Sequence, residues 1–506
     1  MRLQVCALLT LALSAPAYAT WREATSDNFI VYSDGSQSSL VSFTEQVEKF
    51  DQVLRLMTGL DKPPAPVKVR IYLVDGSSDV RELDPTHRPL LGFYGAEIDG
   101  GIAVVDREPA RSEFSASGES VLYHEYTHHY VAQYFTNAYP VWYQEGVAEY
   151  FGATVFHKDG TIDIGRLQMP RLPTLAQGVW LSPQQLMNDT VEQLPTSQWN
   201  QFYAQGWLLT HYLFHDPTRN DHFRQYLTLR ARGMAHTEAL QKAFGLNDKE
   251  LETQLRAYFA KGKLSYSRLT TPRVKAIEVT TRELSQPEGD LLLLALRVKL
   301  GMPQAEQHGV LEHIRAKAAQ FPGNEFAQVV QAEAELRLGG DRARAQERLQ
   351  ATLASNPNHR RAMLDLAWWE LSAKDLDSTA RLEAERRART WVVKANRLAP
   401  NDPEALYLFY VTFAHEPAGP SQNAIDALSE AYLYLPQYQP TAQLLARQEL
   451  HDGKPDRAVS ILEPIAYSPH AGPGAEKLRE WIAKMKADPS GVPADTSVKD
   501  SEGGSQ

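Results

Sequence analysis

The residues best suited to carry chemistry lie in the segment His124-Glu125-Tyr126-Thr127-His128. On an α-helix, residues i and i+4 lie on the same face, so the two imidazoles can bind one metal ion together. Glu125 then lies beside the metal, where its carboxylate can accept a proton from water. Zinc suits these ligands, and a catalytic zinc keeps one position open for water. The alternative is that both histidines occupy a solvated helix face or a hydrogen-bonded core.

A second segment, Trp142–Phe151, supplies carboxylates for this site. A zinc site with two histidines needs a third protein ligand. Glu145 follows His128 by 17 positions, and the break at Asn137-Ala138-Tyr139-Pro140 allows a second helix to fold back against the first. Glu149 is one turn further along and lies on the same helix face as Glu145. Position alone therefore leaves two glutamates that could reach toward the histidines.

Together the two segments resemble the gluzincin metallopeptidases, in which a HExxH helix is followed by a helix with a glutamate ligand. The sequence of these segments is most similar to bacterial collagenases and M1-type aminopeptidases. Glu145-Gly146-Val147-Ala148 matches the EG-x-A motif in which their ligand glutamate occurs. The resemblance covers residues 28–262 in general layout, but its specific part is confined to residues 121–152 and one further patch. It implies that Glu145 is the third zinc ligand, while Glu149 resembles an acidic residue of thermolysin-like gluzincins that orients a ligand histidine, here His124.

The further patch is Tyr203-Ala204-Gln205-Gly206-Trp207. In M1-type relatives, a tyrosine in a Y-x-K-G context donates a hydrogen bond to the tetrahedral intermediate, and Gln205 here replaces the lysine. A tyrosine hydroxyl is a neutral donor of high pKa, which suits this role for Tyr203. The alternatives are that Tyr203 is an ordinary core residue or that His211 is the donor. No G-x-M-E-N motif occurs near residues 92–101, which favours an endopeptidase over an aminopeptidase.

The elements that must position these residues change character along the chain. Residues 20–117 mix strand and helix patterns, with strands expected at 29–32, 67–74 and 102–105 and a helix at 39–60. Residues 118–263 are mainly helical, with a hairpin at 153–165 around Asp159-Gly160. The resemblance implies an α+β, thermolysin-like catalytic domain with a small mixed sheet and a helical active-site part. The strand at 100–105 is expected to offer an edge to an extended substrate.

A polar segment with Pro272 and Pro287, residues 264–288, is expected to be a linker between two independent domains. Residues 289–487 read as helix after helix, with prolines at intervals of 35, 43, 36 and 33 residues, close to the 34-residue tetratricopeptide period. These prolines are Pro322, Pro357, Pro400, Pro436 and Pro469. An all-α solenoid of repeats is expected, with a lengthened helix pair between residues 365 and 398; the alternative is an irregular helical bundle. Residues 488–506 have the composition of a disordered tail.

Composition and the N-terminus bound the remaining possibilities. The chain has 506 residues, with 52 basic and 62 acidic side chains and a net charge of −10, which disfavours general nucleic-acid binding. Residues 1–19 read as a secretory signal, with Arg2, an apolar run and Ala17-Tyr18-Ala19 as the cleavage site. The single cysteine, Cys6, lies inside this segment, so the mature chain has neither a disulfide nor a thiolate ligand. No apolar run of the mature chain is long enough to span a membrane.

The sequence thus predicts a periplasmic or secreted zinc metallopeptidase that acts on protein or peptide substrates. Its repeats are expected to dock a protein partner or the substrate. The rival hypothesis is a repeat scaffold or envelope assembly factor that keeps zinc only for stability. The intact Glu125 argues against this rival, because a structural zinc site needs no base.

Overall fold

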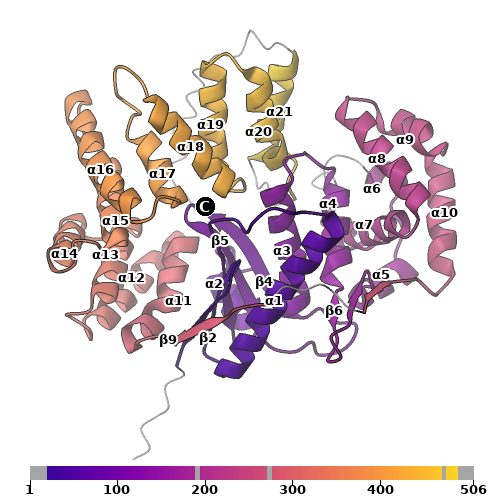
Figure 1. Cartoon of the computed structure of the whole chain (residues 1–506), viewed down its shortest axis with the longest axis horizontal. Helices are drawn as coiled ribbons and strands as arrows, with labels where there is room; N and C mark the ends of the chain where they lie inside the picture. The colour runs from indigo at the N-terminus through magenta and orange to yellow at the C-terminus, as the bar shows by residue number, and fades with distance from the viewer. Residues whose placement is uncertain (1–19, 188–193, 271–275, 470–473, 488–506) are drawn as a thin grey trace, which may run out of the picture.

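A mixed sheet lies at the centre of the first half of the chain (Figure 1). The computed structural model describes residues 20–187, 194–270, 276–469 and 474–487; the expected signal peptide and C-terminal tail lie outside these ranges. Six strands are ordered β4-β5-β3-β2-β1-β9; β2, β3 and β5 run parallel, and β1, β4 and β9 are antiparallel to their neighbours. The strands are β1 (Arg22–Thr25), β2 (Phe29–Ser33), β3 (Val69–Val74), β4 (Gly92–Glu97), β5 (Gly100–Asp106) and β9 (Thr280–Glu283).

Side chains alternate across the sheet and divide between two cores, as the two-residue period of a strand requires. Val69, Ile71 and Val105 face one core with helices α1 (Gln37–Thr58) and α3 (Gly118–Tyr134). Tyr72 and Val104 face the other core, with α2 (Ser77–Leu83) and α11 (Gln286–Leu300). Helix α11 therefore covers one face of the sheet, although the sequence placed it in a separate domain.

A helical subdomain follows the sheet and encloses its own apolar core. A small second sheet, ordered β6-β7-β8, lies beside it, and its β6–β7 turn at Asp159-Gly160 was expected. The elements here are α4 (Val141–Gly152), β6 (Val155–Phe156), β7 (Ile162–Ile164), η1 (Met169–Arg171), α5 (Leu172–Gln177), α6 (Pro183–Leu186), η2 (Thr196–Gln198), α7 (Trp199–Phe214), α8 (Pro217–Ala231), α9 (His236–Phe244), α10 (Asp248–Ala260) and β8 (Ser267–Leu269).

Two expectations about this half differ from the structure. The expected linker, residues 264–288, contributes β8, which pairs with β7, and β9, which pairs with β1; its residues 271–275 lie outside the described ranges. These pairings attach the segment to both sheets. The strand at Gly100–Asp106 is interior, between β4 and β3, so β4 is the sheet edge next to α3.

The second half of the chain is a series of helices, each packed against the next, as expected for helical repeats that resemble tetratricopeptides. Pro322, Pro357, Pro400 and Pro436 each stand three residues before a helix, and α16 is the lengthened helix. In the described residues, no helix is long and apolar enough to cross a bilayer. After α11 come α12 (Gln304–Ala318), α13 (Glu325–Arg337), α14 (Arg342–Ser355), α15 (Arg360–Leu371), α16 (Ser378–Leu398), α17 (Pro403–Val411), α18 (Gln422–Tyr434), α19 (Gln439–His451), α20 (Pro455–Ala466) and α21 (Ala475–Ala487).

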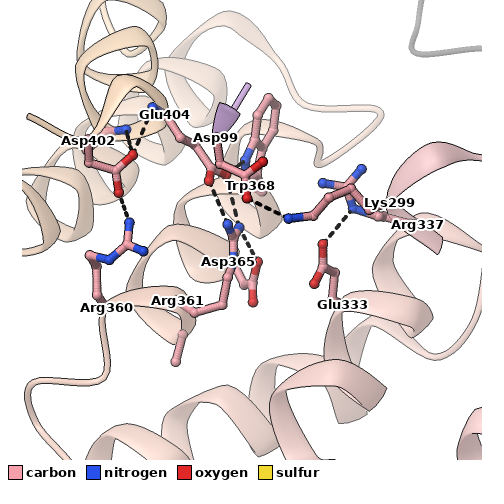
Figure 2. Close-up of polar contacts among 12 residues, drawn as sticks. Asp99, Lys299, Glu333, Arg337, Arg360, Arg361, Asp365, Trp368, Asp402 and Glu404 are labelled. Carbon is pink, nitrogen blue, oxygen red and sulfur yellow. Dashed lines mark hydrogen bonds and ion pairs between the residues drawn. The ribbon is translucent and has the colours of Figure 1, made fainter. Parts of the chain in front are cut away.

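These repeats form an arc that passes around the sheet (Figure 1). Asp99, in the turn between β4 and β5, accepts hydrogen bonds from Arg70 of β3 at 2.6 and 2.8 Å and from Lys299 of α11 at 2.5 Å. In the same cluster, Arg361 of α15 donates to Glu404 of α17 at 2.6 and 3.0 Å (Figure 2). The bond from Lys299 thus joins the hairpin turn to α11, the helix that begins the second half of the chain.

Candidate metal centre

Helix α3 begins where it does because of two local features. Ser117 and Ser120 form a capping box, with each side chain accepting the other's backbone N–H at 3.1 Å. Gly118 lies directly against the end of β5, where an added Cβ would come within 1.9 Å of the carbonyl oxygen of Asp106. The helix is thus anchored to the sheet, and His124 and His128 follow on one of its faces.

The structure brings the three expected ligands together. The Nε2 atoms of His124 and His128 are 3.1 Å apart, and Oε2 of Glu145 on α4 lies 3.2 and 3.4 Å from them. Ligands about 2.0–2.1 Å from a tetrahedral zinc lie ~3.3 Å from one another. The donor set and its spacing therefore fit zinc. Among the described residues, His124, His128 and Glu145 form the cluster of His, Cys, Asp and Glu side chains whose ligand atoms are close enough to hold one metal ion.

Glycines set the close crossing of α4 and α7 that places Glu145. A Cβ on Gly146 would lie 2.2 Å from Oγ1 of Thr210 and 2.5 Å from the carbonyl oxygen of Gly206. Both contacts are far inside van der Waals distance, so a larger residue would push α4 away from α7. The glycine after Glu145 therefore serves helix packing and fixes the depth at which the carboxylate reaches the histidines.

Charge at the site favours an ionised carboxylate. Burial works against it, but the charges and hydrogen bonds of His128 and His124 hold the pKa of Glu145 well below its usual range. Burial likewise opposes a charged His124, but the hydrogen bond and charge of Glu145 raise the pKa of His124 to about 9. Metal ligation needs an ionised carboxylate and a neutral imidazole, so metal binding would release the proton that His124 holds.

Glu149 lies beside these three residues, with its Oε1 3.5 Å from Nδ1 of His124. Arg171 of η1 clamps this carboxylate by donating from Nη2 at 2.5 Å and from Nε at 3.2 Å. Gln168 donates to the backbone carbonyl of Glu149 at 3.0 Å. Sequence reasoning missed Arg171, because neither periodicity nor a motif marks it.

Tyr203 of α7 lies at the edge of the same cluster. Its ring packs under the guanidinium of Arg171, with 5.1 Å from Cζ to the ring centroid. The negative charge of Glu145, followed by burial, raises the pKa of Tyr203 well above its usual range, so the phenol stays protonated. Glu125 also contributes to this shift, which places Glu125 and Tyr203 within electrostatic reach of one another.

Two other histidines have different surroundings. His211 is fully buried and hydrogen-bonds to the hydroxyl of Tyr258 and the carbonyl of Ser265, both at 2.8 Å. Burial lowers the pKa of His129 to about 4, and the hydroxyl of Tyr94 on β4 lies 2.8 Å from its Nδ1. His211 thus belongs to the helical core, and His129 joins α3 to the edge strand.

Comparison with known proteins finds likeness among solved structures. No family model and no curated protein matches the chain. Among solved structures, a thermophilic TPR protein of Thermus thermophilus is similar at 18% sequence identity and a TM-score of 0.32. The match covers 40% of this chain and 99% of that one.

Proposed function

We propose that this protein is a zinc metallopeptidase of gluzincin type, with a thermolysin-like catalytic half and endopeptidase action on proteins or peptides. The observation that supports this most directly is the spacing of 3.1–3.4 Å among the ligand atoms of His124, His128 and Glu145. A carboxylate beside such a site, Glu125, is what a hydrolase needs and a purely structural zinc site does not.

Each residue of the site has a distinct part in this proposal. Zinc held by the three ligands would polarise the scissile carbonyl and lower the pKa of water. Glu125 accepts the proton of the attacking water and passes it to the leaving amine. The hydroxyl of Tyr203, protonated at all working pH values, donates a hydrogen bond to the developing oxyanion. Arg171 holds Glu149, which orients His124 through its second ring nitrogen.

The proposal includes export. Arg2, the apolar run after it and the small residues Ala17 and Ala19 occur in the order of a secretory signal. We place the mature protein in the periplasm or outside the cell, where it would meet unfolded or surface-exposed proteins.

The helical repeats support a second candidate function, a scaffold that binds envelope proteins and keeps zinc for stability. Repeat arcs commonly present a concave binding surface. The two functions differ in one respect that experiment can reach, because only the peptidase requires Glu125.

The test is chelator-sensitive cleavage of an unfolded protein, such as reduced and carboxymethylated casein, by the zinc-loaded full chain. Glu125→Gln should retain one zinc per chain by metal analysis and lose activity by about 10²-fold or more, the usual range for removing a general base. Wild-type protein that holds zinc and cleaves nothing would favour the scaffold. Activity retained by Glu125→Gln would contradict the role given to Glu125 as general base.

A further inference from the structure

A cavity of about 380 Å³ lies where the repeats meet α3 and β4. On one side it is lined by Tyr94, Gly95 and Ala96 of β4 and by His128 and Ala132 of α3. Because His128 is one of the three metal-site residues, the cavity borders the candidate centre directly. Ala132 is one turn after His128 and lies on the same face of α3.

The other side of the cavity comes from the repeats. Tyr432 of α18, Pro436 and Tyr438 of the following turn, Pro440 of α19 and Ile465 of α20 line it. No Asp, Glu, Lys or Arg occurs among the described residues of the lining. Thr136, Gln437, Gln439 and Ser468 add uncharged polar groups to the lining, and His129 also borders it. A volume in the range of about 300–1,000 Å³ with mainly apolar and aromatic walls and a few polar groups is typical of a site that binds an uncharged group.

Hydrogen bonds fix the two sides against one another. Gln437 donates to the backbone carbonyl of His129 at 3.1 Å, and Gln133 of α3 donates to the carbonyl of Leu433 at 3.2 Å. Gln144 of α4 donates to the carbonyl of Tyr467 at 2.8 Å. The repeat wall is therefore attached to both helices that carry the metal-site residues.

The β4 wall leaves room for a peptide backbone. Among the described residues, β4 pairs only with β5 and leaves its other side unpaired in the sheet. A Cβ placed on Gly95 would meet nothing within 4 Å. An extended chain passing the metal centre along this edge would direct alternate side chains toward the repeats.

We propose that this cavity is a substrate subsite in which the repeats determine specificity for a large, uncharged apolar or aromatic side chain close to the scissile bond. The inference rests on the proposed peptidase function. In this proposal the repeats around α18–α20 help to determine which peptides the enzyme cleaves. Tyr432 and Ile465 would contact the substrate side chain and select it by size and polarity.

The test compares the cleavage sites produced by four full-length proteins on a proteome-derived peptide library, read by mass spectrometry. Wild type should favour Phe, Tyr, Leu or Met at one position and reject charged residues there. Ala132→Phe fills the cavity and should lower kcat/KM for a peptide with Phe at that position by about 10-fold or more, with little effect on one with Ala. Tyr432→Ala enlarges the cavity and should weaken the discrimination.

Leu433→Ala is the matched control, because Leu433 is 65% exposed and lies outside the lining. It should keep the wild-type profile. An unchanged profile in Ala132→Phe overturns the proposal even if Tyr432→Ala fails to fold. The proposal is also overturned if the cleavage profile of Leu433→Ala changes as much as that of Tyr432→Ala.

Binding separates this inference from the proposed function. The affinity of Glu125→Gln for a labelled Phe-containing peptide and for its Ala counterpart can be measured by fluorescence anisotropy. Glu125→Gln should bind the Phe peptide more tightly. The double variant Glu125→Gln/Ala132→Phe should bind both peptides equally. Preferential binding without any cleavage by wild type would contradict the peptidase and leave a peptide-binding cavity. Cleavage without a preference that depends on Ala132 or Tyr432 would contradict the subsite alone.

Discussion

At the scale of single residues, Glu145 and Glu149 lie one turn apart on α4 and meet different partners. Glu145 contacts both histidine Nε2 atoms, whereas Glu149 faces Nδ1 of His124 and is held by Arg171. Two histidines without Glu145 are too few ligands for tight zinc binding. Loss of a supporting carboxylate typically costs about 10–100-fold in metal affinity or activity.

We therefore expect Glu145→Ala to be zinc-free after mild dialysis and Glu149→Ala to keep some zinc and measurable turnover. Metal analysis of the dialysed proteins checks the order. Since Glu149→Ala leaves the guanidinium of Arg171 without its carboxylate, Glu149→Gln serves as a gentler control. An empty site in Glu149→Ala and a filled one in Glu145→Ala would reverse the ligand assignment.

A Tyr203 variant can separate a role in the chemical step from a role in substrate binding. Tyr203→Phe should lower kcat by about 10²–10³-fold, with little change in KM or zinc content, because a donor to the oxyanion acts in the transition state. Tyr212→Phe is the matched control on α7, since its hydroxyl donates to Gln254 at 2.6 Å in the helical core. Equal losses in the two variants, or a loss confined to KM, would contradict the role given to Tyr203.

Helical periodicity places His124 and His128 of the candidate metal site on one face, and one chain break lets the next helix fold back. The choice of Glu145 over Glu149 came from the resemblance, not from position. Arg171 was not predictable, because it reaches Glu149 through a fold-back of 22 residues that no periodic pattern encodes. Edge strands were hard to recognise for a similar reason. β9 (Thr-Thr-Arg-Glu) is largely exposed and has no apolar alternation, and β4 contains two glycines, which are poor strand formers.

At the scale of elements, the β4–β5 hairpin carries an acidic group whose protonation affects stability. Burial, with the charge of Asp99, raises the pKa of Glu97 from 4.5 to about 7, against the opposing charges of Arg337, Lys299 and Arg70. Between about pH 4.5 and 7, the carboxyl of Glu97 thus keeps its proton in the folded protein and loses it in the unfolded chain. Stability from this group is complete below pH 4.5 and is lost as the pH rises through 7.

Glu97→Gln should accordingly unfold at a higher urea concentration than wild type at pH 8 and at nearly the same concentration at pH 4.5. Urea midpoints across this range measure the difference, and Glu113→Gln, at an exposed position, provides the control. A difference from wild type that does not change with pH would show that the carboxyl of Glu97 is not protonated in the fold.

At the scale of the whole molecule, α11 joins the two halves, because Leu291 and Val298 pack with α12 and α13 while its other side covers the sheet. Leu296 of α11 packs with Tyr72 and Val104 on the sheet, and β9 supplies the strand that pairs with β1. A cut inside the expected linker removes both and exposes an apolar sheet face.

A fragment of residues 20–266 should therefore aggregate, whereas a fragment of residues 20–301 should be more soluble and retain zinc. Soluble yield and metal content of the two fragments test this. A soluble, zinc-bound 20–266 fragment would show that α11 and β9 are dispensable, as the sequence alone had suggested.

The hydrogen bond between Gln437 and His129 joins residues 308 positions apart. At a synthesis rate of about 5–20 residues per second, the ribosome adds Gln437 roughly 15–60 s after His129. The metal-site helices and the edge strand are therefore complete long before the wall that the repeats place against them. A nascent or prematurely terminated chain can carry His124, His128 and Glu145 and still lack the cavity beside them.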